Sequence, residues 1–271
     1  RIALFLQSPS PLYEQIEKGQ IKFDFYDLKG KIASHIASLQ SSQPTIIVAP
    51  PSILRQLMGR VQIDKLEKIY SIAEVLDPIE RAQFEEAFAL TIDQIYQATE
   101  GCIATTCSHG TLHIHEDLMA IEKEIISEEE GKFYPIITDF TRITQPIIRY
   151  QLDDILTEKK GACPCGSPHL AIESIDGRGS HILSFPTIDG SRSIDFYPDL
   201  ISKRIWLIAP EVRGYQIIQK SPLEIAIAIQ CPERDKPHCQ ELVKRVILSQ
   251  IKKMGTSADW SRLAYTFDDA R

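Results

Sequence analysis

A threonine and a glutamate, Thr99 and Glu100, stand together after an apolar segment, residues 91–95, that has the composition of a buried strand. Nucleotides bind at strand ends in α/β sheets, so chemistry on a polyphosphate is expected here. A threonine hydroxyl can hydrogen-bond phosphate oxygens, and a glutamate carboxylate can hold the Mg²⁺ that offsets their charge. The alternative is a helix start, because Thr is a good N-cap residue and Glu favours a first turn.

Three cysteines and one histidine offer a second set of chemical groups: Cys107, His113, Cys163 and Cys165. Thiolate and imidazole ligands suit tetrahedral zinc, and the C-P-C-G segment at residues 163–166 supplies two sulfurs from one tight turn. Buried thiols without a metal are the alternative, because C-x-C spacing is less specific than C-x-x-C. The rival histidine ligands are His109, His115 and His169. With four protein ligands the metal would be structural.

Short apolar runs alternate with helical patterns over the first hundred residues. The strand-like runs are residues 2–6, 21–26, 45–49, 68–72 and 91–96, and the helical patterns are residues 12–18, 32–39, 52–58 and 78–88. Such alternation predicts an α/β fold, a parallel sheet with crossover helices. Thr99 and Glu100 would follow the last strand of this sheet.

The helical period fades after about residue 102, and short β-rich runs follow one another. They are residues 112–115, 120–126, 133–138, 147–152 and 170–175, and they predict an antiparallel or barrel-like subdomain that contains the zinc ligands. Beyond residue 179, strand-like runs at 215–219, 224–230 and about 263–267 and a helix at 239–254 predict a small α+β domain. The expected parts are therefore residues 1–101, 102–178 and 179–271.

The composition excludes several kinds of partner. Thirty basic and thirty-seven acidic residues give a formal charge of −7, and the Lys/Arg clusters are short, so neither nucleic acid nor an anionic membrane is expected. No apolar run approaches the roughly 20 residues that span a bilayer. The six cysteines are expected to be reduced thiols or metal ligands, and the protein is expected to be cytoplasmic.

Four segments, in order, resemble those of adenylate-forming enzymes, the superfamily that activates carboxylates as acyl-adenylates. Residues 96–100, Y-Q-A-T-E, resemble its Tyr-x-x-Thr-Glu motif, and residues 149–154, R-Y-Q-L-D-D, resemble its R-Y-R-T-x-D stretch. Residues 71–76 are similar to its G-A-E segment, and Gly177-Arg178 resembles its hinge. Cys107, Leu112-His113 and the C-P-C-G segment at residues 163–166 match the C…G-L-H…C-P-C-G pattern of the phenylacetate–CoA ligase branch, which includes deazaflavin coenzyme synthetases.

The resemblance implies a nucleotide site for ATP and AMP and a role for each matched residue. The catalytic residues would be Thr99, Glu100 and Arg178, and the nucleotide-binding residues would be Ala73, Glu74, Tyr96, Gln97 and Asp154. Asp154 would accept hydrogen bonds from the ribose hydroxyls, Arg178 would neutralise phosphate, and zinc would be structural. A core role for Tyr96 and a turn at the Asp153-Asp154 pair are the alternatives.

Three departures from the superfamily pattern accompany these matches. The Ser/Thr/Gly phosphate loop is expected to precede Arg1 in a longer chain, no lysine fits the superfamily's G-K context, and Gly179-Ser180-His181 replaces the acids of the hinge. The predicted function is ATP-dependent activation of a carboxylate, an aromatic or other organic acid, with thioester formation on coenzyme A as a second step. The alternative is a non-catalytic nucleotide-binding or zinc-stabilised scaffold. The sequence does not predict the acyl group or the oligomeric state.

Overall fold

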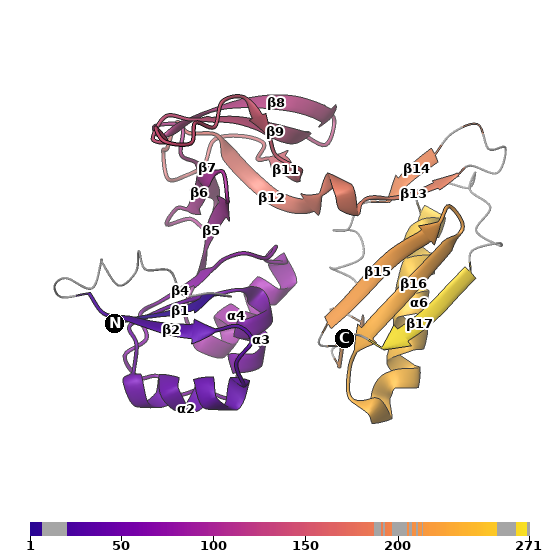
Figure 1. Ribbon diagram of the computed structural model, residues 1–271, viewed down its shortest axis with the longest axis horizontal. Coiled ribbons are helices and arrows are strands. Elements are labelled where there is room, and N and C mark those ends of the chain that lie inside the picture. The colour runs from indigo at the N-terminus through magenta and orange to yellow at the C-terminus, as the bar shows by residue number, and fades with distance from the viewer. Residues whose placement is uncertain are drawn as a thin grey trace. The chain divides into compact units, whose positions relative to one another are not determined.

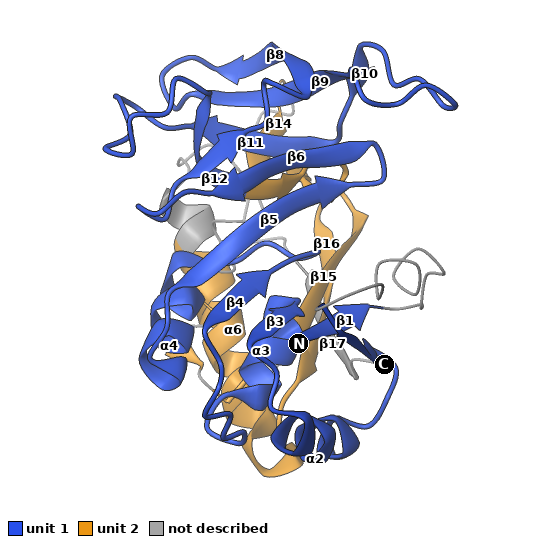
Figure 2. Cartoon of the chain, turned by 90° about the vertical axis from the view of Figure 1, so that its left-hand side faces the viewer, with its two compact units in different colours: residues 1–175 blue, residues 176–271 orange. Residues whose placement is uncertain are grey.

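The chain divides into two compact units, Arg1–Ile175 and Asp176–Arg271 (Figure 2). The computed structural model describes residues 1–6, 21–186, 191, 193–196, 205, 208–209, 211–212, 214–253 and 264–269. The helix expected at residues 12–18 lies outside the described residues. The three-part division expected from the sequence stays a prediction beside this two-unit division.

A parallel sheet forms the first part of unit 1, as the alternating pattern predicted (Figure 1). Its strands run in the order β2-β1-β3-β4-β5, and every neighbouring pair is parallel. They are β1 (Ile2–Leu6), β2 (Phe23–Asp27), β3 (Ile46–Ala49), β4 (Lys68–Ser71) and β5 (Ile92–Ala98). The helices are α2 (Ile32–Ser42), α3 (Pro51–Leu57) and α4 (Pro78–Phe88).

Local sequence signals explain where α4 begins. The Asp77 side chain caps the helix by accepting a hydrogen bond of 2.7 Å from the Ile79 backbone N–H, and Pro78 fits the first helical position because it has no N–H to satisfy. Phe84 points from α4 into the apolar core of the parallel sheet and is 1% exposed. The helix therefore begins and ends where the sequence predicted.

One partly buried ion pair joins α3 to α4. The Arg55 Nε donates to Glu80 Oε1 at 2.9 Å, and Glu80 is 4% exposed. Burial raises the pKa of the Glu80 carboxyl, and the Arg55 guanidinium opposes that rise. This pair fixes α3 against α4, and the Arg55 charge offsets part of the cost of burying the Glu80 carboxyl.

An antiparallel part continues the same sheet beyond β5. The order is β10-β9-β11-β12-β7-β6-β5, with β8 paired to β9. The strands are β6 (Gly101–Thr106), β7 (Leu112–Ile114), β8 (Met119–Ser127), β9 (Lys132–Asp139), β10 (Tyr150–Gln151), β11 (Asp154–Glu158) and β12 (Ala171–Arg178). A second apolar core, which includes Ile103, Phe133 and Leu156, lies in this part.

Two sequence expectations for the antiparallel part were wrong. Strand β6 was missed, and the single strand expected at residues 147–152 is replaced by the two-residue β10 and the separate β11. The physical reason lies in the backbone of that run. Arg149 has a left-handed φ of 46°, which a regular strand does not accommodate, and Pro146 lacks the N–H that pairing requires.

Unit 2 is the small α+β domain that the sequence predicted. Strands β15 (Gly214–Ser221) and β16 (Glu224–Gln230) are antiparallel, and β17 (Ala264–Asp269) pairs with β16 in parallel. Helix α6 (Lys236–Lys253) lies between β16 and β17 in the chain, and a hairpin of β13 (Leu183–Pro186) and β14 (Ser193–Phe196) precedes them. In the described part of the chain, no helix is both long enough and apolar enough to cross a membrane.

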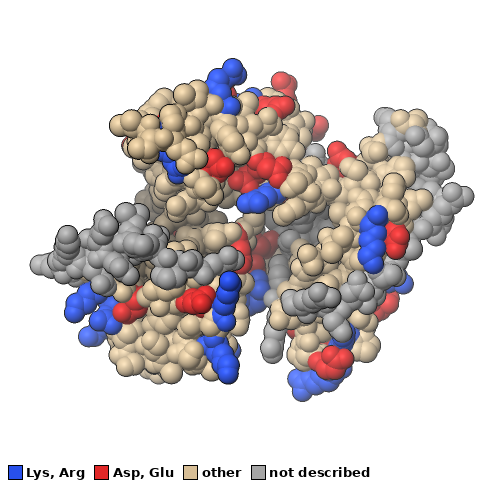
Figure 3. All heavy atoms as spheres, viewed as in Figure 1, with Lys and Arg blue, Asp and Glu red and all other residues tan. Residues whose placement is uncertain are grey.

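Charged side chains of both signs lie interspersed on the face that Figure 3 shows. Among the described residues, ion pairs at the surface join Lys123 to Glu158 and Arg149 to Glu122.

Candidate functional site

Thr99 and Glu100 form the two-residue loop of the hairpin between β5 and β6, since Ala98 pairs with Gly101. The helix start that the sequence left open is therefore wrong. Thr99 is exposed and Glu100 is half-buried at the tip. The pair thus follows β5, as the sequence predicted, but at the tip of an antiparallel hairpin, because β5 pairs in parallel with β4 only over residues 92–94.

A hydrogen bond joins two of the predicted nucleotide segments. The Tyr96 hydroxyl donates to Asp154 Oδ2 at 2.6 Å, across 58 residues of chain. Tyr96 is 8% exposed and packs in the core of the antiparallel part, which favours the core role over stacking on a base. Asp154 begins β11 rather than following a strand. The bond holds Asp154 against Tyr96, which lies only three positions before Thr99 in the sequence.

The segment expected beside the adenine leaves the neighbouring strand β4. Ser71 at its end pairs with Gln94 of β5, so Ala73 and Glu74 emerge beside the part of β5 that leads to Tyr96. Ala73 has a φ of 65°, a strained conformation for a residue with a side chain.

The Glu74 carboxylate has a role that sequence reasoning missed. It accepts hydrogen bonds from the Ser52 backbone N–H at 3.0 Å and from the Ser52 hydroxyl at 2.7 Å. It therefore satisfies the first turn of α3. Adenine recognition by the Ala73–Glu74 backbone stays a prediction, and it is compatible with this use of the side chain.

The remaining predicted nucleotide residues differ in their surroundings. Gln97 is exposed on β5 and pairs with Cys102 of β6. Arg178 ends β12 and belongs to unit 2. Thr99 and Glu100 belong to unit 1, and the role of Arg178 at the phosphates stays a prediction.

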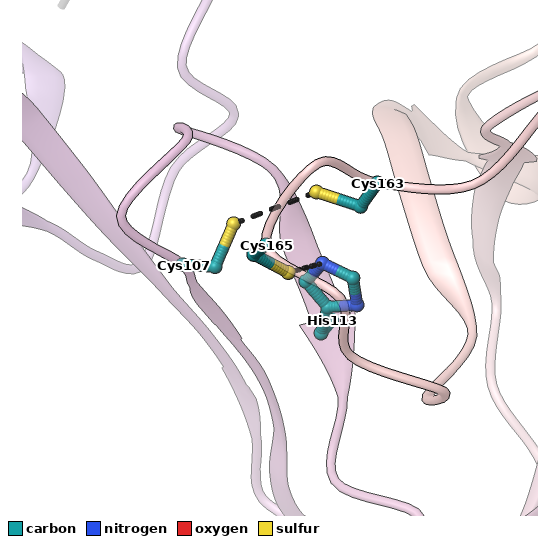
Figure 4. Close-up of side chains that lie close together, drawn as sticks. All are labelled: Cys107, His113, Cys163 and Cys165. Carbon is teal, nitrogen blue, oxygen red and sulfur yellow. Dashed lines mark hydrogen bonds between the residues drawn. The ribbon is translucent and has the colours of Figure 1, made fainter.

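The four predicted metal ligands lie together in the antiparallel part (Figure 4). We call Cys107, His113, Cys163 and Cys165 the cysteine–histidine centre, and their ligand atoms all lie within 4.8 Å of one another. Cys107 follows β6, His113 lies in β7, and the other two cysteines lie in the loop between β11 and β12. Residues more than fifty positions apart are thus gathered at one point.

The distances within the cysteine–histidine centre fit zinc geometry. A tetrahedral Zn²⁺ with Zn–S bonds of about 2.3 Å places its sulfurs about 3.8 Å apart, and a shorter Zn–N bond brings nitrogen slightly closer to sulfur. The Cys107 and Cys163 sulfurs are 3.8 Å apart, and Cys165 Sγ lies 3.4 Å from His113 Nε2. All six cysteines are free, so the 3.8 Å pair is not a disulfide.

The local backbone stabilises thiolates at this centre. The His109 N–H donates to Cys107 Sγ, and the Ser167 N–H donates to Cys165 Sγ, each at 3.4 Å. The Cys165 backbone N–H, with smaller help from the His113 side chain, lowers the pKa of the Cys163 thiol to about 6. The Ser167 N–H also lowers the pKa of the Cys165 thiol, but burial and the neighbouring Cys163 and Cys107 sulfurs outweigh it and raise that pKa overall. The backbone therefore favours the metal-binding thiolate at Cys163.

A backbone contact orients the imidazole of His113. Its Nδ1 lies 3.1 Å from the His169 carbonyl oxygen and donates to it, which leaves Nε2 directed at the sulfurs. The His169 ring instead accepts a hydrogen bond from the Glu116 N–H. Within the described residues, the metal-ligating group contains His113 and none of the three rival histidines.

No family model matches the chain, but curated proteins and solved structures include similar proteins. A curated relative, a phenylacetate-coenzyme A ligase from Thermus thermophilus, is 22% identical over 241 residues, which are 82% of this chain and 52% of that protein. A crystal structure of 2-hydroxyisobutyryl-CoA ligase with an acyl-AMP has a TM-score of 0.67 at 14% identity, over 91% of this chain and 55% of that one.

Two further kinds of solved structure share the fold. An anthranilate CoA ligase in complex with anthranoyl-AMP has a TM-score of 0.58 at 12% identity, over 88% of this chain and 49% of that one. The A domain of a carboxylic acid reductase from Segniliparus rugosus, in complex with AMP, has a TM-score of 0.64 at 10% identity, over 92% and 45%. The chain spans about half the length of the relatives it matches.

Proposed function

We propose that this chain, which has the fold of the adenylate-forming superfamily, takes part in ATP-dependent activation of a carboxylate as an acyl-adenylate with release of pyrophosphate. The hydrogen bond between Tyr96 and Asp154 is the observation that carries the proposal. It brings the Y-Q-A-T-E segment and the R-Y-Q-L-D-D segment together, although 58 residues separate the two partners. These are the segments to which the resemblance assigns the phosphates and the ribose.

The proposed roles follow from the chemistry of each side chain. Thr99 at the exposed tip would donate to a phosphate oxygen, and Asp154 would accept from the ribose hydroxyls. Glu100 is a half-buried carboxylate at the same tip, which suits a Mg²⁺ that retains most of its waters. Mg²⁺ when bound would neutralise charge on the phosphates. In-line attack by a carboxylate on the α-phosphorus needs this neutralisation and correct positioning more than acid–base groups.

The acceptor and the substrate are finer parts of the same proposal. We propose coenzyme A as the acyl acceptor and an aromatic or other organic acid as the substrate. The curated relative and two of the similar structures are named as CoA ligases, which supports the acceptor. The partners would be small molecules, and we keep the prediction of a cytoplasmic protein. The cysteine–histidine centre would hold a structural zinc, because four protein ligands leave no open position for a substrate.

Carboxylate-dependent exchange of pyrophosphate into ATP, measured on the complete protein, tests the proposal. The variant Glu100→Gln keeps the size of the side chain and removes its charge, so the exchange rate should fall by about 10² or more. Glu124→Gln, which removes an exposed carboxylate of β8, is the matched control and should keep the wild-type rate.

Two outcomes would refute adenylation at this site. A panel of aromatic and aliphatic acids that yields no exchange with the wild-type protein, although ATP binds, would favour a nucleotide-binding scaffold. An unchanged rate in Glu100→Gln would remove the proposed metal role from the hairpin tip.

A further inference from the structure

The hairpin loop that carries Thr99 and Glu100 has an unusual backbone for its length. Two-residue hairpin loops favour type I′ or II′ turns, which need a positive φ at the first loop residue, because these turns match the twist of the strands. Thr99 and Glu100 are both described, and neither has a positive φ. The loop therefore adopts a turn that two-residue hairpins disfavour, and contacts from outside the hairpin are expected to stabilise it.

Arg142 supplies such a contact from 43 residues away. Its Nη2 donates to the Thr99 carbonyl oxygen at 2.6 Å, and its Nε lies 3.5 Å from Asp139 Oδ2. A guanidinium donor makes this a charge-assisted hydrogen bond, which is stronger than one between neutral groups. The Thr99 carbonyl and the Glu100 N–H belong to one rigid peptide plane. Arg142 thus holds the plane that joins the two proposed catalytic residues.

Asp139, which pairs with Arg142, closes its own turn and lies beside Gly101, the residue that follows Glu100. Its Oδ1 accepts from the Thr141 N–H at 2.7 Å and from the Thr141 hydroxyl at 2.6 Å, and its side chain is 6% exposed. Its Oδ2 lies so close to Gly101 that a Cβ there would be 3.2 Å away. The segment from Asp139 to Arg142 therefore contacts the hairpin on both sides of Glu100.

We propose that Arg142 is a positioning residue for adenylation, which fixes the directions of the Thr99 hydroxyl and the Glu100 carboxylate through the peptide plane between them. This inference rests on the proposed function and extends it to a residue outside the matched motifs. Displacing reacting groups by about 1 Å costs on the order of 10²-fold in rate. Loss of the Arg142 contact should therefore lower kcat rather than weaken nucleotide binding.

The variant Arg142→Met, in the complete protein, removes the charge and the donors while it keeps a long side chain. The kcat of ATP–pyrophosphate exchange should fall by about tenfold to a hundredfold, with the KM for ATP within about threefold of wild type. Arg142→Lys retains one donor for the Thr99 carbonyl and should recover part of the loss. Lys160→Met is the matched control, because Lys160 donates to the Glu129 carbonyl of another hairpin turn at 2.9 Å, and it should behave as wild type.

Amide hydrogen exchange provides a readout that does not depend on activity. The Glu100 and Gly101 amides should exchange at least about tenfold faster in Arg142→Met than in wild type, while those of β3 and β4 remain unchanged. If the wild-type protein shows no ATP–pyrophosphate exchange with any acid, the proposed function fails. Faster amide hydrogen exchange in Arg142→Met would still support the structural link between Arg142 and the hairpin loop. Unchanged amide exchange at Glu100, or a kcat within twofold of wild type in both variants, would overturn the inference. If Arg142→Met does not fold, Arg142→Lys decides by the same two measurements.

Discussion

Loss of the metal from the cysteine–histidine centre should destabilise the antiparallel part of unit 1. Cys107 and Cys163 are separated by 56 positions, so a metal that binds both closes a loop of that length. Treated as a cross-link, such a loop stabilises the folded state by about 4 kcal/mol at 25 °C, because it lowers the entropy of the unfolded chain. For a chain of this length, that free energy corresponds to a Tm lower by roughly 8–16 °C.

The perturbation is Cys163→Ser, which has a similar size but no thiolate, or treatment of the wild-type protein with a strong chelator. Elemental analysis should find one zinc per chain in wild type and less than about 0.1 in the variant. Thermal unfolding followed by circular dichroism measures the change in Tm. Cys102→Ser is the matched control, because Cys102 is an exposed cysteine outside the centre, and it should retain both zinc and Tm.

The reasoning is refuted by either of two results. Purified wild-type protein without bound zinc would show that the gathered thiols are buried cysteines with no ligand. A chelator that removes zinc without lowering Tm would show that the metal does not cross-link the fold.

Four further substitutions test single side chains. Asp154→Ala should raise the KM for ATP by about tenfold to a hundredfold with a smaller change in kcat, and Tyr96→Phe, which keeps the carboxylate, should have a smaller effect in the same exchange assay. Arg55→Met should lower the free energy of unfolding, measured by urea titration, by about 3–5 kcal/mol at pH 8, because it leaves Glu80 buried and unpaired. Burial raises the pKa of Glu80 in the folded state, so this loss should shrink as the pH falls towards 5 and the carboxyl takes up a proton; an equal loss at both pH values would contradict this reasoning. Phe84→Ala should cost about 3–5 kcal/mol in the same titration, since the ring is 1% exposed in the core of the parallel sheet.

Sequence patterns predicted the parallel sheet well because its signals are local. The Asp77-Pro78 pair determines where α4 begins, and apolar runs of strand length alternate with helical periods throughout this part. The cysteine–histidine centre was predictable for a different reason. The residue types left buried thiols and three other histidines as alternatives, and the resemblance to the C…G-L-H…C-P-C-G pattern of the phenylacetate–CoA ligase branch singled out these four residues.

The contacts between distant segments were not predictable from one sequence. Arg142 has the appearance of an ordinary surface arginine, and only the fold places it at the Thr99 carbonyl. Glu74 likewise stabilises α3, a helix 22 positions earlier, rather than a helix of its own. Such partners depend on the tertiary structure, which cannot be predicted from a local hydrophobic period or a short motif.

Strand β5 changes partners along its length. Ile92, Asp93 and Gln94 pair in parallel with β4, and residues 95–98 pair antiparallel with β6. The Thr106 hydroxyl contacts both the N–H and the carbonyl of Gln94 at this point, at 2.7 and 3.2 Å. The two ladders of β5 therefore meet end to end.

A sheet resists bending where several strands lie side by side. We therefore expect unit 1 to bend most easily at residues 94–95, where the two ladders of β5 meet. Flexing there would carry Thr99 and Asp154 together, since both belong to the antiparallel part, while Ala73 and Glu74 would move with the parallel part. The junction would then act as a hinge. Bending at it would change the distance between Ala73 and Glu74, proposed for the base, and Thr99 and Asp154, proposed for the phosphates and the ribose.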